Sequence, residues 1–181
     1  MQGNLKDSVL RPEILKRILI YSLLTLFLGC IQCAFFPLLD FCPQTPDLVL
    51  VMLVAIALLD GPTAAMICSV GAGFFVDAIG ASGFAFAPLI YFLTVALVSL
   101  FTGKILKSFP SYILLLVPTL LCRATATLIC LLVTGGAIPL FTATKLILLP
   151  EMVCTALSAV PIYFLVKLCC MPLRSHGKFT F

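Results

Sequence analysis

Long apolar runs dominate this sequence and constrain its fold more than any other feature. The runs at 18–36, 84–102 and 111–133 are each close to the roughly 20 residues that a helix needs to cross a bilayer. Only 10% of the 181 residues are charged and 62% are hydrophobic, whereas soluble domains carry roughly 25% charged residues. We therefore expect an all-α, polytopic membrane protein. The composition excludes a water-soluble enzyme, a nucleic-acid-binding protein and a disordered chain.

Six apolar segments are predicted to be helices: 18–36, 48–59, 63–79, 84–102, 111–133 and about 145–168. The turn at Asp60-Gly61-Pro62 divides the long run after Asp47 into a helical hairpin. Its first arm has a dozen residues, so it is either a short span or a re-entrant arm. We interpret 18–36 as an uncleaved signal-anchor helix, because no small-residue cleavage site follows it.

The basic residues predict the orientation of these spans. With six spans and both termini in the cytoplasm, most of the 11 Lys and Arg lie inside, as the positive-inside rule requires. These residues are Lys6, Arg11, Lys16, Arg17, Lys104, Lys107, Lys167, Arg174 and Lys178. A five-span arrangement would send part of this set outward. We expect a cytoplasmic segment at 1–17, a transmembrane domain at 18–170 and a basic cytoplasmic tail at 171–181.

Three ionisable residues fall within the spans: Asp77, Arg123 and Glu151. A charge at membrane depth costs roughly 2.5–3.5 kcal/mol on insertion scales, so such groups face protein or a cavity. From the helix rise, Arg123 lies roughly 16 Å and Glu151 roughly 9 Å from the outer ends of two consecutive helices. We predict an ion pair between them in the outer half of the bundle, which Asp77 could join. It is either a structural pair or a polar cavity open to the outside.

Small and aromatic residues carry further expectations about packing. Gly71 and Gly73 lie in a segment where small residues let helices approach closely, and helix packing is favoured there over gating or substrate contact. The four tyrosines are expected at the membrane interfaces; they are Tyr21, Tyr91, Tyr112 and Tyr163.

Motifs for catalysis or cofactor binding are missing from the sequence. It has no P-loop, HExxH or GxSxG pattern, and the single histidine, His176, lies in the basic tail. Cys30 and Cys33 have the spacing of a redox or metal pair, but they fall within an apolar run and are interpreted as packing residues. We therefore expect no enzymatic activity, no cofactor and no metal.

The order of several short motifs resembles the rod shape-determining protein MreD family. The resemblance covers about residues 30–103. It includes Ile31-Gln32, Pro37, Pro46-Asp47-Leu48-Val49-Leu50, Gly61-Pro62, Gly71-Ala72-Gly73-Phe74, Asp77, Gly80 and Gly83. The last two spans match in length and hydropathy alone. Ala64-Ala65 departs from the family pattern, which often has a further glycine there.

This resemblance implies a non-enzymatic, multi-pass protein of the bacterial inner membrane that takes part in cell elongation and peptidoglycan synthesis. Its partner would be the coiled-coil membrane protein MreC and, through it, MreB and the peptidoglycan synthase. The family also resembles the six-helix S components of energy-coupling-factor (ECF) transporters, so a vitamin-type binding subunit is the alternative. Structural or partner-binding candidates are Asp47, Gly71, Gly73, Asp77, Arg123 and Glu151. The segments 48–59 and 63–79 are candidate partner faces, because close packing needs a neighbour; that neighbour is either a partner or another helix of this chain.

Overall fold

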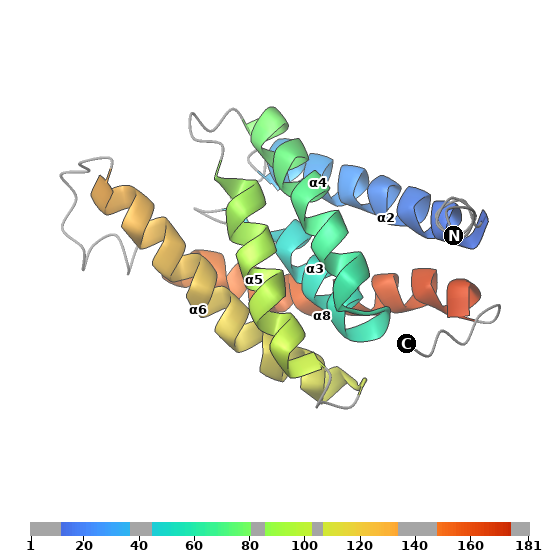
Figure 1. Cartoon of the computed structure of the whole chain (residues 1–181). Coiled ribbons are helices and arrows are strands. Elements are labelled where there is room, and N and C mark those ends of the chain that lie inside the picture. Colours follow the sequence, from blue (N-terminus) through green and yellow to red (C-terminus); the bar gives the residue numbers. More distant parts are fainter. Residues whose placement is uncertain (1–11, 37–44, 81–85, 103–106, 134–147, 175–181) are drawn as a thin grey trace, which may run out of the picture.

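The computed structural model describes residues 12–36, 45–80, 86–102, 107–133 and 148–174, and these ranges contain helices and no strands (Figure 1). The helices are α2 (Pro12–Cys30), α3 (Leu48–Leu59), α4 (Pro62–Gly80), α5 (Ala87–Thr102), α6 (Phe109–Val133) and α8 (Leu149–Arg174). A π-helical segment, η1 (Ile31–Phe35), continues α2. Four segments are long and apolar enough to cross a membrane: Lys16–Phe35, Pro62–Ile79, Phe109–Ile129 and Leu149–Cys170. The fold therefore indicates a membrane protein.

The predicted segments agree with the observed helices in their middles and differ at some ends. The helices predicted at 63–79 and 111–133 are extended by one or two residues. However, α2 begins at Pro12 and α8 continues to Arg174, six residues beyond each predicted limit. Hydropathy predicts where the apolar side chains end. The helix itself ends only where its backbone N–H and C=O groups stop pairing, so these two helices extend beyond their apolar residues. Residues 84, 85 and 145–147 lie outside the described ranges.

Helix α3 is the centre of the bundle. All twelve of its side chains are buried, with exposed fractions between 0% and 7%. It contacts α2, α4, α5, α6 and α8, and in Figure 1 it lies behind α4 and α5. A helix that is hydrophobic on every side is stable only when protein or lipid surrounds it. At 12 residues it is roughly 18 Å long against a hydrocarbon core of roughly 30 Å, so it does not span by itself. Of the two neighbours expected for this segment, a partner or another helix of the chain, the structure therefore shows the second.

The two candidate glycines of α4 have different surroundings. A Cβ atom on Gly73 would lie 2.2 Å from Pro88 Cα, so this glycine allows α4 and α5 to touch through their backbones. A Cβ atom on Gly71 would meet nothing within 4 Å. Helix packing within the chain therefore explains Gly73 and does not explain Gly71.

The four tyrosines lie in the core, so the prediction that they mark the membrane interfaces is wrong. All four are buried, with exposed fractions of 0–2%. The Tyr112 hydroxyl donates to the Val51 carbonyl of α3 at 3.3 Å, and the Tyr112 ring lies 4.9 Å from the Tyr163 ring. An amphipathic ring suits an interface, but it equally suits a core that offers its hydroxyl a hydrogen-bond partner.

The contact at Gly73 gives a test of this packing. The Gly73→Ala variant is expected to lose about 1–3 kcal/mol of stability, because the added methyl group forces α4 and α5 apart. Gly71→Ala is the matched control, since it gains the same helix propensity without a clash. Thermal unfolding in detergent measures both variants. Equal melting temperatures for the two would contradict the close approach at Gly73.

Candidate functional site

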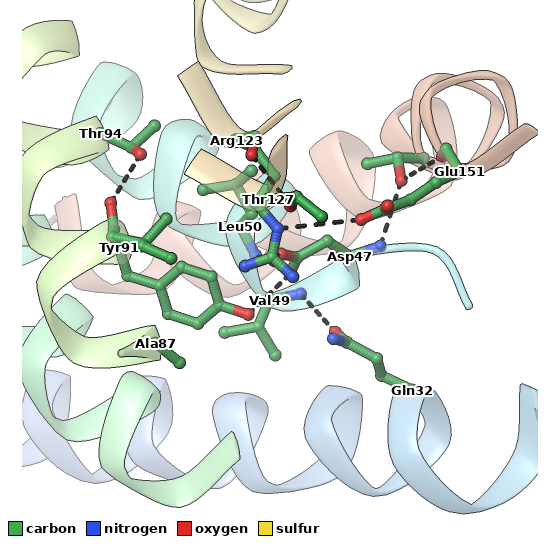
Figure 2. A network of polar contacts seen from close by, with 12 residues as sticks. Gln32, Asp47, Val49, Leu50, Ala87, Tyr91, Thr94, Arg123, Thr127 and Glu151 are labelled. Atoms are coloured by element: carbon green, nitrogen blue, oxygen red, sulfur yellow. Dashed lines mark hydrogen bonds and ion pairs between the residues drawn. The ribbon is translucent and has the colours of Figure 1, made fainter. Parts of the chain in front are cut away.

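The two ends of α3 have backbone groups that must find partners inside the protein. The first N–H groups and last carbonyls of a helix have no partner within it, and neither lipid nor a packed apolar core can supply one. At the beginning of α3, the N–H groups of residues 48–51 are all bonded, and Figure 2 shows the bond of Val49 to Gln32. Two of these N–H groups donate to backbone oxygens: Leu48 to Pro46 O at 3.1 Å and Val51 to Asp47 O at 3.3 Å. The other two donate to side chains: Val49 to Gln32 Oε1 at 3.3 Å and Leu50 to Asp47 Oδ1 at 3.0 Å.

Asp47 is the central residue of this first cluster, which we call the Asp47 cluster (Gln32, Asp47, Tyr91, Arg123, Glu151 and Thr155). Its carboxylate is the N-cap of α3 and is 2% exposed. Besides the bond to Leu50, Oδ1 accepts from the Tyr91 hydroxyl at 2.8 Å. Its backbone N–H donates to Thr155 Oγ1 at 3.1 Å. One residue thus connects α3, α5 and α8.

Arg123 lies between two carboxylates, as Figure 2 shows. Its Nε is 3.8 Å from Glu151 Oε1, so the predicted ion pair is present. A second contact is shorter, because Arg123 Nη1 lies 3.3 Å from Asp47 Oδ2. The guanidinium carbon is also 5.8 Å from the centre of the Tyr91 ring, within the range of a cation–π contact. Asp47 is therefore the nearer anionic partner of Arg123.

Helix termini help to balance the charges of this cluster. Two carboxylates face one guanidinium, which would leave one negative charge in excess. Asp47 caps the beginning of α3, and Glu151 lies in the first turn of α8. Each helix N-terminus is equivalent to roughly half a positive charge, so the two termini together offset the excess. The arrangement thereby brings three charged side chains together inside the bundle with little net charge.

Asp77 caps a neighbouring helix and also acts on the charge of Arg123. Its Oδ2 accepts a hydrogen bond from the Ala87 N–H at 3.1 Å, which caps the first residue of α5. The ion pairs of Arg123 within the described residues are those with Asp47 and Glu151. Asp77 connects α4 to α5 in this way, and its charge also interacts with that of Arg123, as expected of a residue that could join the pair.

A second polar cluster surrounds the other end of α3; we call it the Asp60 cluster (Arg17, Tyr21, Asp60, Lys107 and Cys170). Asp60 is the C-cap of α3, pairs with Arg17, and accepts from the Tyr21 hydroxyl at 2.8 Å. Lys107 Nζ donates to the Leu59 carbonyl at 3.1 Å. Cations are favourable at a helix C-terminus. Arg17 and Lys107, which the sequence explains through orientation alone, therefore also hold α3 in place.

Several members of these clusters are not predicted by the sequence. Gln32 and Asp60 stand out there only as parts of short motifs, and Tyr91 is expected at an interface. One signal exists for Asp60. Asp60 directly follows a twelve-residue segment with no polar side chain, and such a segment must be capped by polar residues if it is buried. Gln32 is instead a polar residue within an apolar run, sixteen positions before Leu48. Tyr91 carries no comparable signal.

The Asp47 cluster can hold helices in register, but its shape does not suit a large ligand. The cavity that it lines measures about 10 Å³, whereas small-molecule sites measure roughly 300–1,000 Å³. Among the described residues, no group of three or more His, Cys, Asp or Glu could hold a metal ion. Cys30 and Cys33 are free thiols; Cys30 is exposed on the bundle surface, contrary to its interpretation as a packing residue.

Comparison of the chain with protein-family models, with curated proteins and with solved structures found no match. The roles of the two clusters are therefore inferred from their contacts and burial. The geometry assigns both to stabilising α3.

Because Arg123 lies nearer to Asp47 than to Glu151, substitutions in this cluster are expected to lower the stability of the protein by different amounts. Arg123→Gln leaves Asp47 buried beside no cation and is expected to cost about 3 kcal/mol, which corresponds to roughly 6–12 °C in melting temperature. Glu151→Gln is expected to change it by less than about 3 °C, because Asp47 keeps its cation. Thermal unfolding in detergent compares both with Arg123→Lys, which keeps the charge. A loss for Glu151→Gln as large as that for Arg123→Gln would contradict the central place of Asp47.

The hydrogen bond from Lys107 to the end of α3 can be tested separately from the positive charge of this residue. Lys107→Met removes the donor to Leu59 O and is expected to lower stability by about 1 kcal/mol. Lys16→Met removes the same charge from an exposed position and is expected to leave the melting temperature unchanged. If both variants unfold at the same temperature, Lys107 acts through charge alone.

Proposed function

We propose that this chain is a membrane scaffold of the bacterial cell-elongation machinery that works by binding a single-span partner such as MreC. The motif order that resembles the MreD family motivates this function. The structural observation that carries it is the closed Asp47 cluster. Its charges bond one another around a cavity of about 10 Å³. A protein whose interior polar groups are engaged in this way acts through its membrane-facing surface.

The same observation weighs against the alternative, an ECF-type S component. Such a subunit needs a cavity for a vitamin-sized molecule beside its polar residues. Glu151, Arg123 and Asp47 instead hold the helices of the described chain together. Ligand binding there would require the salt bridges that cap α3 to open. The scaffold is therefore the better-supported function.

A shallow groove between α2 and α4 is the partner face that we favour. It has a volume of about 290 Å³ and is lined by residues that include Ser22, Cys68 and Gly71. A Cβ atom added to Gly71 would have no neighbouring atom within 4 Å, so the backbone of α4 is open to a neighbour there. Small residues of this kind let a second transmembrane helix approach closely. Gly71, which intramolecular packing leaves unexplained, fits contact with a partner helix.

We further propose that the chain is a multi-pass protein of the plasma membrane with both termini in the cytoplasm. Arg17 and Lys107 are far apart in sequence and meet the same end of α3, Arg17 at Asp60 and Lys107 at the Leu59 carbonyl. This juxtaposition supports one basic, cytoplasmic side. The Asp47 cluster then lies toward the outside.

The groove predicts the effect of one bulky substitution. Gly71→Leu fills the groove without disturbing the fold and is expected to reduce co-purification with the coiled-coil partner at least about tenfold, equivalent to about 1.4 kcal/mol. Ala156→Leu, at an exposed position of α8, is the control. Cells that depend on the Gly71→Leu chain should become round. Retention of a small molecule together with assembly on an ATPase module, without the coiled-coil partner, would contradict the scaffold function.

A further inference from the structure

The charged residues of the Asp47 cluster line a small, partly open cavity. It is lined by the charged residues Asp47, Arg123 and Glu151, by Thr155, and by apolar side chains that include Ala124. Its volume is about 10 Å³. A buried water needs roughly 10–15 Å³ by this measure, together with two to four polar partners. The space therefore fits one water molecule and nothing larger.

Two buried atoms of residues that line this cavity lack hydrogen-bond partners within the described chain. They are Asp47 Oδ2 and Arg123 Nε. Asp47 as a whole is 2% exposed, so bulk solvent does not reach its carboxylate freely. The 3.8 Å between Arg123 Nε and Glu151 Oε1 is too long for a hydrogen bond. Polar atoms at such a separation are commonly bridged by water.

We propose that one ordered water molecule binds between Arg123, Asp47 and Glu151. It accepts a hydrogen bond from Arg123 Nε and donates to Asp47 Oδ2 and to Glu151 Oε1. These three bonds are the usual number for a buried water. A metal cation does not suit the same space, because the guanidinium of Arg123 would repel it at short range. This water site stands independently of the proposed scaffold function.

The water also explains how Glu151 takes part in the cluster. Its carboxylate is too far from Arg123 Nε for a direct hydrogen bond, and the bridging water transmits the interaction. Asp47 has three direct contacts through its carboxylate, to Leu50, Tyr91 and Arg123. The site is therefore a direct Asp47–Arg123 pair with a water-linked Glu151.

A structure of the full chain, at a resolution that shows other buried waters, tests this directly. We expect a density peak within hydrogen-bond distance of Arg123 Nε, Asp47 Oδ2 and Glu151 Oε1. Absence of that peak, or a peak with the coordination of a metal ion, overturns the proposal.

A pair of isosteric variants gives a second test. Ala124→Val and Ala124→Thr fill the cavity equally, but only threonine brings a hydroxyl that can replace the displaced water. The valine variant is expected to melt about 4 °C below the threonine variant. The pair Ala126→Val and Ala126→Thr, two residues further along α6 and away from the cavity lining, corrects for the difference in propensity. A corrected difference of zero, or a more stable valine variant, means that the cavity is dry.

Discussion

The structure depends on one constraint: a twelve-residue apolar helix is buried at the centre of the bundle, so the polar groups at its ends need partners from other parts of the chain. Every α3 side chain is at most 7% exposed. Its first four N–H groups are bonded to protein oxygens, and its last carbonyl accepts from Lys107. Asp47 lies at the beginning, where an anion is favourable, whereas Arg17 and Lys107 lie near the end, where their positive charges offset the Asp60 carboxylate and suit the helix C-terminus. Polar residues of the other helices are therefore placed to serve α3.

This constraint connects the fold to the proposed function. Because the described interior charges are used to hold α3, they are not available to surround a large ligand. The groove between α2 and α4 differs from this charged interior, because its lining is mostly apolar. At Gly71 the backbone of α4 is not covered by other side chains. A closely packed centre with an open helix face suits a protein that binds another transmembrane helix. A transporter subunit would instead have to break these contacts to open around its substrate.

The sequence predicts the fold class well and the site only in part. Apolar runs and the Asp60-Gly61 turn predict the six α-helices found in the described ranges, because each depends on local hydropathy or backbone preference. The Arg123–Glu151 pair is also predicted, since both residues lie within spans, where charges need partners. The nearer partner of Arg123 is not predicted, because Asp47 is adjacent to an expected loop. Gly71 and Gly73 show a further limit: they are two positions apart, about 200° around a helix, so the same residue type faces opposite surroundings.

The enclosure of α3 is the central claim, and labelling from the lipid tests it most directly. A photoreactive group on a phospholipid acyl chain, activated with the full chain in a bilayer, marks the side chains that lipid touches. We expect labels on exposed residues of the outer helices, such as Leu23 on α2 and Leu100 on α5, which are 63% and 69% exposed. No residue of Leu48–Leu59 should be labelled above background. Labelling of α3 at a yield comparable to that of α2 would contradict the account.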